Sequence, residues 1–334
     1  MLVNFDKINF FKTNLKARGP LGVIKRYLSR RLCMLRKIPY NVQIEITNFC
    51  NLKCPYCSAS LDVVDCKKQS MSFLEFQKIV DALKRKRLYY PTLSLYFRGE
   101  PLLNQEVILM IEYATGKGCD VTISTNGSML QKAEFRQKIL QSGLHLLILS
   151  IDGASKETYN KSRVGEDFER IISFSKAIVA EKRALKLRKP FIEWQYVITR
   201  ETEAEMDAAK RMSQKIGMDN IRFKTFKLNF FGKELAEVLS HAEKYNPINP
   251  RYSRYTIKDN QIALKDYLPR CESGLNCVVY VDGSVTTCCE DVGEKHKGRN
   301  VLQDDFWSVW NSKEYKSKRK AACHKQLDIC RYCN

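Results

Sequence analysis

Long hydrophobic runs are missing from this sequence, although 44% of its 334 residues are hydrophobic. A membrane-spanning helix needs about 20 apolar residues in a row, so no segment is expected to cross a bilayer. The first residues include Asp6, Lys7 and Lys12 and lack the apolar core of a secretion signal. We therefore expect a cytoplasmic protein, whose 13 cysteines stay as thiols that can bind metal instead of pairing as disulfides.

Histidine is also scarce, with four residues in the whole chain, and this limits the kinds of metal site. Cys50, Cys54 and Cys57 have the spacing Cys-x3-Cys-x2-Cys, while the next cysteine is Cys66 and the nearest histidine is His145. A closed zinc site would want a fourth Cys or His close by. Three thiolates instead leave one corner of a four-iron cluster open for a substrate or cosubstrate. The spacing favours an iron–sulfur cluster with a chemical role, and a zinc site is the alternative.

Acidic residues are too few to balance the basic ones: 57 Lys and Arg face 37 Asp and Glu, which gives a net charge of +20. Such a charge can indicate nucleic-acid binding, but the basic residues are spread along the chain and no long basic and aromatic tract is present. We therefore expect no nucleic-acid partner. A positive field can instead attract a phosphorylated substrate, an acidic redox partner or anionic lipid.

Residues 1–40 are predicted to form a basic, helical N-terminal extension. Apolar residues fall near one helical face between Leu21 and Leu35, with Lys and Arg around them. Packing of this helix on the main domain is favoured because it needs no partner. Peripheral contact of the basic N-terminus with a membrane is the alternative.

After residue 40, short apolar or β-branched runs alternate with amphipathic segments. The predicted strands are Val42–Ile46, Leu93–Phe97, Val121–Ser124, Leu146–Ile151, Ile192–Ile198 and Ile221–Phe226. The predicted helices are one that begins at Ser72, where Ser72 and Glu75 form a capping box, and Gln105–Gly116, Lys132–Ser142, Asp167–Ala180 and Thr202–Ile216. This alternation predicts an α/β fold with a parallel sheet, and six such units suit a partial (β/α)6 barrel of the TIM type.

Polar motifs follow four of the predicted strands. The cysteine triad follows the first strand, and the next three strands are followed by Arg98-Gly99-Glu100-Pro101, Ser124-Thr125-Asn126-Gly127 and Ser150-Ile151-Asp152-Gly153. Chemistry in parallel α/β folds sits at the carboxyl ends of the strands. The four motifs are therefore predicted to converge on one rim.

The triad and the order of these motifs resemble the radical S-adenosylmethionine (SAM) superfamily. The resemblance implies a [4Fe–4S] cluster on the triad, with SAM on its open iron, and a 5′-deoxyadenosyl radical that removes a hydrogen atom from the substrate. Gly99 and Glu100 match the later part of the family's Gly-Gly-Glu-Pro motif, which contacts the methionine amino group. Arg98 stands here in place of the first glycine, so the sequence departs from the family's motif at this position.

The same resemblance implies further SAM-binding residues, for which ordinary turn or packing roles are the alternative. They are Thr125, Asn126, Ser150 and Asp152 for the ribose hydroxyls and the methionine carboxylate, Arg163 near that carboxylate, and Tyr56 beside adenine.

The C-terminal region is a second cysteine-rich segment. Val278–Val281 and Ser284–Thr287 flank Asp282-Gly283, which predicts a β-hairpin. Cys271-x11-Gly283-x4-Cys288 resembles the opening of the radical SAM extension called SPASM, or twitch in its shorter form, and the four-cysteine series of a full SPASM domain is lacking. The resemblance implies one auxiliary [4Fe–4S] cluster with the ligands Cys271, Cys288, Cys330 and Cys333. Cys289 and Cys277 compete with Cys288, and a zinc ribbon is the alternative.

Three parts of the chain are therefore predicted: the extension at residues 1–40, a radical SAM core at 41–240 and a small SPASM/twitch domain at 241–334. Hydrogen abstraction beside an alcohol, followed by loss of one electron and one proton, yields a carbonyl, as twitch-type dehydrogenases perform. The favoured function is thus an oxidoreductase that acts on a hydroxylated small molecule, of the sugar or aminocyclitol type, with a flavodoxin- or ferredoxin-type electron donor.

The alternative function is a maturase that cross-links or epimerises a peptide, with Cys277 or Cys289 as hydrogen donor. No catalytic residue is assigned by the sequence. Candidates for a general base lie in or near the last two predicted strands, and they are Glu193, Tyr196, Arg200 and Lys224.

Overall fold

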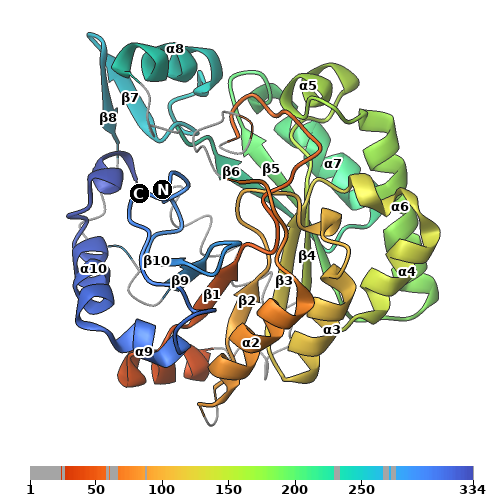
Figure 1. The fold of residues 1–334 in the computed structure, drawn as a ribbon. Coiled ribbons are helices and arrows are strands. Elements are labelled where there is room, and N and C mark those ends of the chain that lie inside the picture. Colours follow the sequence, from red (N-terminus) through yellow and green to blue (C-terminus); the bar gives the residue numbers. More distant parts are fainter. Residues whose placement is uncertain are drawn as a thin grey trace.

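The structure is a computed structural model that describes residues 24, 27–57, 60, 67–86, 89–228, 234–265, 271 and 276–333. Its centre is an eight-stranded sheet in the order β10-β9-β1-β2-β3-β4-β5-β6, with helices packed along its outer face (Figure 1). The six strands β1 to β6 lie in chain order, and each of the first five pairs in parallel with the strand that follows it. This is the predicted α/β fold with a partial barrel.

The six predicted core strands are confirmed with shifts of a few residues at their ends, as are the predicted helices. The main sheet consists of β1 (Asn41–Ile44), β2 (Thr92–Ser94), β3 (Asp120–Thr125), β4 (Leu146–Ser150), β5 (Phe191–Ile198), β6 (Asn220–Thr225), β9 (Asn276–Val279) and β10 (Val285–Thr286), and β7 (Tyr255–Lys258) pairs separately with β8 (Gln261–Leu264). The helices are α2 (Phe73–Lys84), α3 (Val107–Gly116), α4 (Ala133–Gln141), α5 (Lys156–Ser162), α6 (Phe168–Ala184), α7 (Met206–Ile216), α8 (Leu235–Tyr245), α9 (Phe306–Asn311) and α10 (Lys313–Cys323), with short 3-10 turns η1 (Pro101–Leu103), η2 (Ser128–Gln131), η3 (Glu203–Glu205) and η5 (Asp328–Tyr332).

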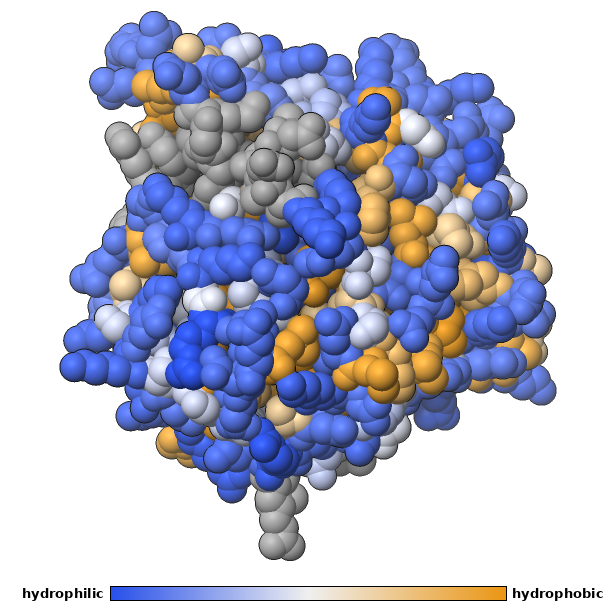
Figure 2. All heavy atoms as spheres, in the orientation of Figure 1, coloured by the Kyte–Doolittle hydropathy of each residue, from blue (hydrophilic) through white to orange (hydrophobic). Residues whose placement is uncertain are grey.

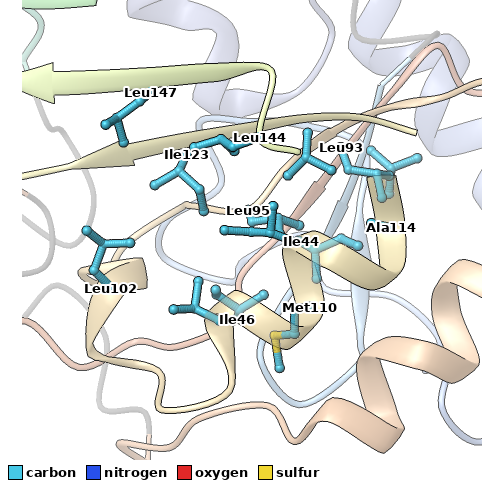
Figure 3. Close-up of a cluster of buried hydrophobic side chains, with 14 of the residues drawn as sticks. Ile44, Ile46, Leu93, Leu95, Leu102, Met110, Ala114, Ile123, Leu144 and Leu147 are labelled. Carbon is cyan, nitrogen blue, oxygen red and sulfur yellow. The ribbon is translucent and has the colours of Figure 1, made fainter. Parts of the chain in front are cut away.

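Alternation along the strands separates the core from the inside of the barrel. Ile44, Leu93, Leu95 and Ile123 point toward α3, where they meet Met110 in a cluster of fully buried side chains (Figure 3). Because successive side chains of a strand point to opposite faces, the residues between them face the concave side of the sheet. These concave-face residues are largely polar, and they include Gln43, Glu45, Ser94, Thr122, Ser124, Ser150, Glu193, Gln195, Arg222 and Lys224.

The predicted C-terminal hairpin forms, but it joins the barrel sheet. β9 pairs antiparallel with β10 and also pairs in parallel with β1, where Val42 lies opposite Cys277. The turn between the two strands places Gly283 at φ 85°, a left-handed conformation that glycine adopts without strain. The C-terminal segment therefore extends the sheet past its first strand.

Helices near the C-terminus pack on the start of the barrel. Trp307 of α9 donates its indole N–H to the carbonyl of Ala82 in α2 at 2.7 Å, and Trp310 donates to the carbonyl of Lys37 at 2.8 Å. Residues 27–36 are helical, as predicted, whereas residues 1–23 of the predicted extension lie outside the described residues. Side chains from both sides of residue 240 share one hydrophobic core, and the division into a core and a SPASM/twitch domain there stays a prediction.

Polar and charged residues cover most of the face shown in Figure 2, with apolar residues interspersed. Among the described residues, no helix combines the length and the apolar character that a membrane crossing requires.

Candidate functional site

The cysteine triad lies in the loop that follows β1. The backbone N–H of Cys57 donates to the carbonyl of Cys54 at 3.1 Å, and the three thiols interact electrostatically with one another. Burial raises the pKa of Cys54 to about 11, although the nearby Arg163 guanidinium opposes the shift. Metal binding must displace this proton, because the thiolate is the form that ligates iron.

Gly99 brings the second motif against this cysteine loop. A Cβ at Gly99 would lie 2.4 Å from the carbonyl oxygen of Thr47 and 2.7 Å from that of Phe49, so only glycine fits. The N–H of Glu100 then donates to the carbonyl of Phe49 at 2.7 Å. The loop that carries the triad and the strand-end motif Gly99-Glu100 are therefore held backbone to backbone.

The Glu100 carboxylate connects the second motif to the third. It accepts hydrogen bonds from the Thr125 hydroxyl at 2.6 Å, the Asn126 N–H at 2.7 Å and the Leu102 N–H at 3.0 Å. Burial raises the pKa of Glu100, and these three hydrogen bonds oppose the shift by favouring the charged form. The arrangement fixes the carboxylate at the rim where the sequence predicts the methionine amino group.

Asn51 is a contact that the sequence did not reveal. It lies inside the triad loop, accepts a hydrogen bond from the Asn126 amide at 3.0 Å and donates to the Ser128 hydroxyl at 3.1 Å. An asparagine among cysteines carries no periodic or motif signal, so this bridge between the first and third motifs becomes visible only in three dimensions.

Asp152 holds the fourth motif to the triad loop. One of its oxygens accepts from the Tyr56 hydroxyl at 3.1 Å and pairs with Arg163 at 2.6 Å, while the other accepts from the Val197 N–H at 2.7 Å. Arg163 also points toward the Cys54 sulfur at 3.9 Å. Asp152 thus positions Arg163 and Tyr56. Its predicted role in binding the ribose hydroxyls or the methionine carboxylate of SAM remains a proposal, as do the SAM contacts of the other motif residues.

Tyr56 is enclosed by aromatic side chains that the sequence analysis did not single out. Its ring packs edge to face on Phe226 and on Tyr245 of α8, with centroids 6.0 and 5.5 Å away. His241 of the same helix lies within hydrogen-bonding distance of the Pro55 carbonyl, at 3.0 Å. Helix α8 therefore covers the triad loop.

The third and fourth motifs also meet each other. Ser150 faces Ser124, with their hydroxyl oxygens 3.3 Å apart.

The residues at this rim fit SAM and a cluster. Three thiols that can ligate iron lie beside the half-buried Arg163. Among the described residues, the buried Nε atom of Arg163 has no hydrogen-bond partner. A carboxylate is the natural ligand for such an orphaned guanidinium N–H. Within the described part of the chain, no three Cys, His, Asp or Glu side chains converge tightly enough to hold a single metal ion.

The proposed auxiliary ligands gather near the end of β10 and the C-terminus. Cys330 interacts electrostatically with Cys271 and Cys333, and Cys288 interacts with Cys333. The Glu290 N–H donates to the Cys288 sulfur at 3.4 Å, and Lys227 donates to the Cys333 sulfur at 3.6 Å. These donors suit thiolates that carry negative charge in a cluster.

The two competing cysteines lie in different surroundings. Cys277 is buried in β9, where its sulfur accepts a hydrogen bond from the Tyr315 hydroxyl at 3.3 Å. Cys289 lies beside Cys288, interacts electrostatically with Cys271 and Cys333, and also lies close to Tyr96 of the barrel. Cys289 therefore remains an alternative to Cys288 as a ligand.

Comparison with protein families matches two regions of the chain. Residues 44–184 match the radical SAM superfamily, and residues 271–334 match the iron–sulfur cluster-binding domain called SPASM. The mycofactocin maturase MftC of Mycolicibacterium smegmatis is 24% identical over 285 residues, which cover 81% of this chain and 69% of MftC. A 7,8-dihydro-6-hydroxymethylpterin dimethyltransferase of Methanocaldococcus jannaschii is 30% identical over 122 residues, which are 36% of this chain and 24% of that protein.

Solved structures share the fold at low sequence identity. BtrN in complex with AdoMet and 2-DOIA aligns with a TM-score of 0.53 and 18% identity over 89% of this chain and 93% of that chain. Streptococcus suis SuiB bound to the precursor peptide SuiA aligns with a TM-score of 0.61 and 12% identity over 91% and 74% of the two chains. Together with the motifs at the barrel rim, the two family matches show that the chain belongs to the radical SAM superfamily, carries a SPASM-type domain and uses SAM and [4Fe–4S] clusters.

Proposed function

We propose that this radical SAM enzyme is an oxidoreductase that removes hydrogen from a hydroxylated small molecule of the sugar or aminocyclitol type. The proposal is carried by the polar concave face of the sheet between the two cysteine sites. Hydroxyl and amide side chains there, such as Ser124, Ser150 and Gln195, suit a substrate that is rich in hydroxyl groups. A hydrophobic substrate would instead be expected to bind among apolar side chains.

The barrel brings this face close to both sites. Tyr96, just after β2, interacts electrostatically with Arg222 and Glu193 across the barrel and with Cys289 of the auxiliary segment. Glu193 is itself fully buried and holds Asn220 and Arg222 of β6 through hydrogen bonds of 2.8 and 3.0 Å. A substrate bound among these residues would lie between the SAM rim and the auxiliary cysteines.

The residues of the chain then have separate tasks. When bound, SAM and the clusters supply the radical chemistry and an acceptor for the electron that the substrate loses. Glu100 and Arg163 hold the two charged ends of the methionine, Gly99 lets the triad loop approach, and Asp152 keeps Arg163 in place. Of the general-base candidates, Tyr196 donates its hydroxyl to the Thr202 carbonyl at 2.8 Å on the helix side, whereas Glu193 and Lys224 lie on the concave face.

Activity also requires an electron donor. The net charge of +20 favours docking of an acidic partner, and flavodoxins and ferredoxins are acidic carriers of single electrons. We propose a carrier of this type as the physiological reductant.

Mass spectrometry of anaerobic reactions with candidate sugars and aminocyclitols tests the function. The expected result is one 5′-deoxyadenosine for each product, with the product about two mass units lighter than the substrate. Omission of SAM is the control and should abolish both products. A product of unchanged mass that has gained solvent deuterium would contradict oxidation and indicate epimerisation.

Peptide maturation is a second candidate, because the similarity to the maturase MftC spans most of this chain. In that case Cys289, on an exposed part of the auxiliary segment, would serve as the hydrogen donor of an epimerase. Replacing Cys289 by Ser separates the candidates if Cys288 is the cluster ligand. An epimerase would lose product while still cleaving SAM, whereas an oxidoreductase would keep forming the oxidised product.

A further inference from the structure

β6 carries two cations on the inside of the barrel. Asn220 and Arg222 face Glu193 on the concave side, whereas Phe223 packs against Tyr196 on the helix side. Lys224 is two residues beyond Arg222, so it shares the concave face. Its side chain is exposed to solvent there, so a dissolved ligand can reach the ammonium group.

The charges around Lys224 are mostly paired with each other. Arg222 forms an ion pair with Glu193 at 2.7 Å, and Lys227 forms one with Glu290 at 2.6 Å. Arg254 donates to the Thr225 hydroxyl at 2.5 Å. Among the described residues, Lys224 makes no ion pair and no hydrogen bond of its own through the ammonium group.

The fold disfavours this positive charge. Loss of surrounding water, together with repulsion by Arg222 and Arg254, lowers the pKa of Lys224 to about 8, and the attractions of Glu193 and Glu290 do not restore it. A cation that neighbouring cations repel and that has no ion-pair partner of its own gains from an anion that arrives with a ligand. The position of Lys224 on the concave face and the charges around it therefore both favour binding of an anion.

We propose that Lys224, with Arg222 beside it, binds an anionic oxygen group of the substrate, a phosphate or a carboxylate. The proposal rests on the proposed function, because it places this anion on the hydroxylated molecule that enters the barrel. The substrate class becomes a phosphorylated sugar or cyclitol, or its uronate counterpart. The anion fixes one end of the molecule at β6, so the other end faces the rim that carries Glu100 and Arg163.

A competing role for Lys224 is to offset the charge of the auxiliary cluster. Lys227 is better placed for that role, since it contacts the Cys333 sulfur at 3.6 Å. The SAM carboxylate is a further competitor for Lys224, but the orphaned Nε of Arg163 lies beside the triad at the SAM rim. The test therefore measures anion binding, SAM binding and iron content separately.

The test measures the binding of inorganic phosphate and of acetate to the anaerobically reconstituted holoenzyme by calorimetry. Wild type is compared with Lys224→Met and with Lys210→Met, a matched control on α7 whose ammonium already pairs with Asp207 at 3.0 Å. We expect phosphate or acetate affinity to fall at least about tenfold in Lys224→Met and to stay unchanged in Lys210→Met. SAM affinity and iron content should be the same in all three proteins. The probe that binds more tightly indicates whether the substrate carries a phosphate or a carboxylate.

Turnover then separates this inference from the proposed function. Glucose, glucose 6-phosphate and glucuronate are compared as activators of SAM cleavage in wild type and in Lys224→Met. Activation by an anionic sugar that Lys224→Met abolishes supports both proposals. Activation by the neutral sugar alone, equal in both proteins, overturns the anion site and leaves the oxidoreductase intact.

Three further outcomes are decisive. Probe binding that depends on Lys224, without SAM cleavage on any hydroxylated compound, supports the anion site and contradicts the proposed substrate class. Probe binding that is absent in wild type, or equal in Lys224→Met, overturns the anion site. Iron loss in Lys224→Met with unchanged phosphate affinity overturns it as well, because the lysine then serves the auxiliary cluster.

Discussion

The cysteines of the first site lie in one loop, residues 50–57, whereas the proposed auxiliary ligands are spread from Cys271 to Cys333. The first loop is tied to the next three strand-end motifs by Gly99, Asn126 and Asp152. The auxiliary cysteines are held mainly by turns of their own segment, such as the Cys333 N–H donating to the Cys330 carbonyl at 3.1 Å. The first site is thus preorganised by the barrel, whereas the second depends on closing long loops and gains more of its order from metal binding.

Arg98 connects the two regions. It forms a bidentate ion pair with Glu45 at 2.6 Å on the barrel side, and it pairs with Glu294 at 2.8 Å and donates to the Val292 carbonyl at 3.2 Å in the auxiliary segment. Burial opposes its charge, but the two carboxylates raise the pKa of Arg98 above its ordinary value. The residue that departs from the family's double glycine therefore joins the SAM rim to the auxiliary segment.

The largest difference between the sites should come from removing the triad. Changing Cys50, Cys54 and Cys57 to Ala should lower the iron content from about eight to about four per chain and abolish SAM cleavage. Iron analysis and 5′-deoxyadenosine assays measure the two effects. Cys323→Ser is the control, because Cys323 belongs to neither proposed ligand set, and it should keep about eight irons. An iron content of about eight per chain in the triple variant would contradict the assignment of a cluster to the triad.

Gly99→Ala should disturb the first site alone. The added methyl group would collide with the carbonyl oxygens of Thr47 and Phe49, displace the triad loop and slow SAM cleavage on the order of a hundredfold. Gly116→Ala is the matched control, since a Cβ there meets no atom within 4 Å and alanine favours a helix. Auxiliary iron should remain in both variants. Equal rates of SAM cleavage in the two would show that the close approach is unimportant.

Arg98→Met should weaken both regions together. It leaves Glu45 buried without its partner, which should cost about 3–5 kcal/mol of unfolding free energy. Denaturant titration of the holoenzyme measures this loss, and iron analysis shows whether the auxiliary cluster is released as well. The double variant Glu45→Gln with Arg98→Met should recover part of the stability because no charge is stranded. A loss below about 1 kcal/mol for the single variant would place Arg98 among ordinary surface ion pairs.

The smallest effect is a gain in stability from Lys224→Met. The pKa of Lys224 is lowered to about 8 from 10.5, so the unfolded chain binds the extra proton between these values, and stability of wild type rises with pH in that window. The variant should therefore melt slightly higher than wild type at pH 7, an effect that solvent around the exposed lysine keeps small, and it should lose this advantage as the pH approaches about 10.5. Melting curves of the holoenzyme at several pH values test this. A lower melting temperature of the variant at pH 7 would show that the lysine stabilises the fold.

The sequence predicted those parts of the fold that depend on local pattern. Short apolar or β-branched runs located the six core strands, and the convergence of parallel strand ends predicted that Glu100 would meet Thr125 and Asn126. The partners of Arg98 and the aromatic enclosure of Tyr56 could not be predicted, because they depend on how distant segments pack. The parallel pairing of β9 with β1 was missed for the same reason, since a hairpin motif specifies its own turn and not the edge on which it docks.

That docking has a consequence for biosynthesis. β1 leaves the ribosome long before β9, so one side of the first strand has unsatisfied backbone groups until nearly the whole chain has been made. Nascent chains with such an open edge are prone to pair with one another, and this exposure ends when β9 pairs with β1. Premature termination before β9 should therefore yield aggregating fragments that chaperones must hold, rather than a functional half-enzyme.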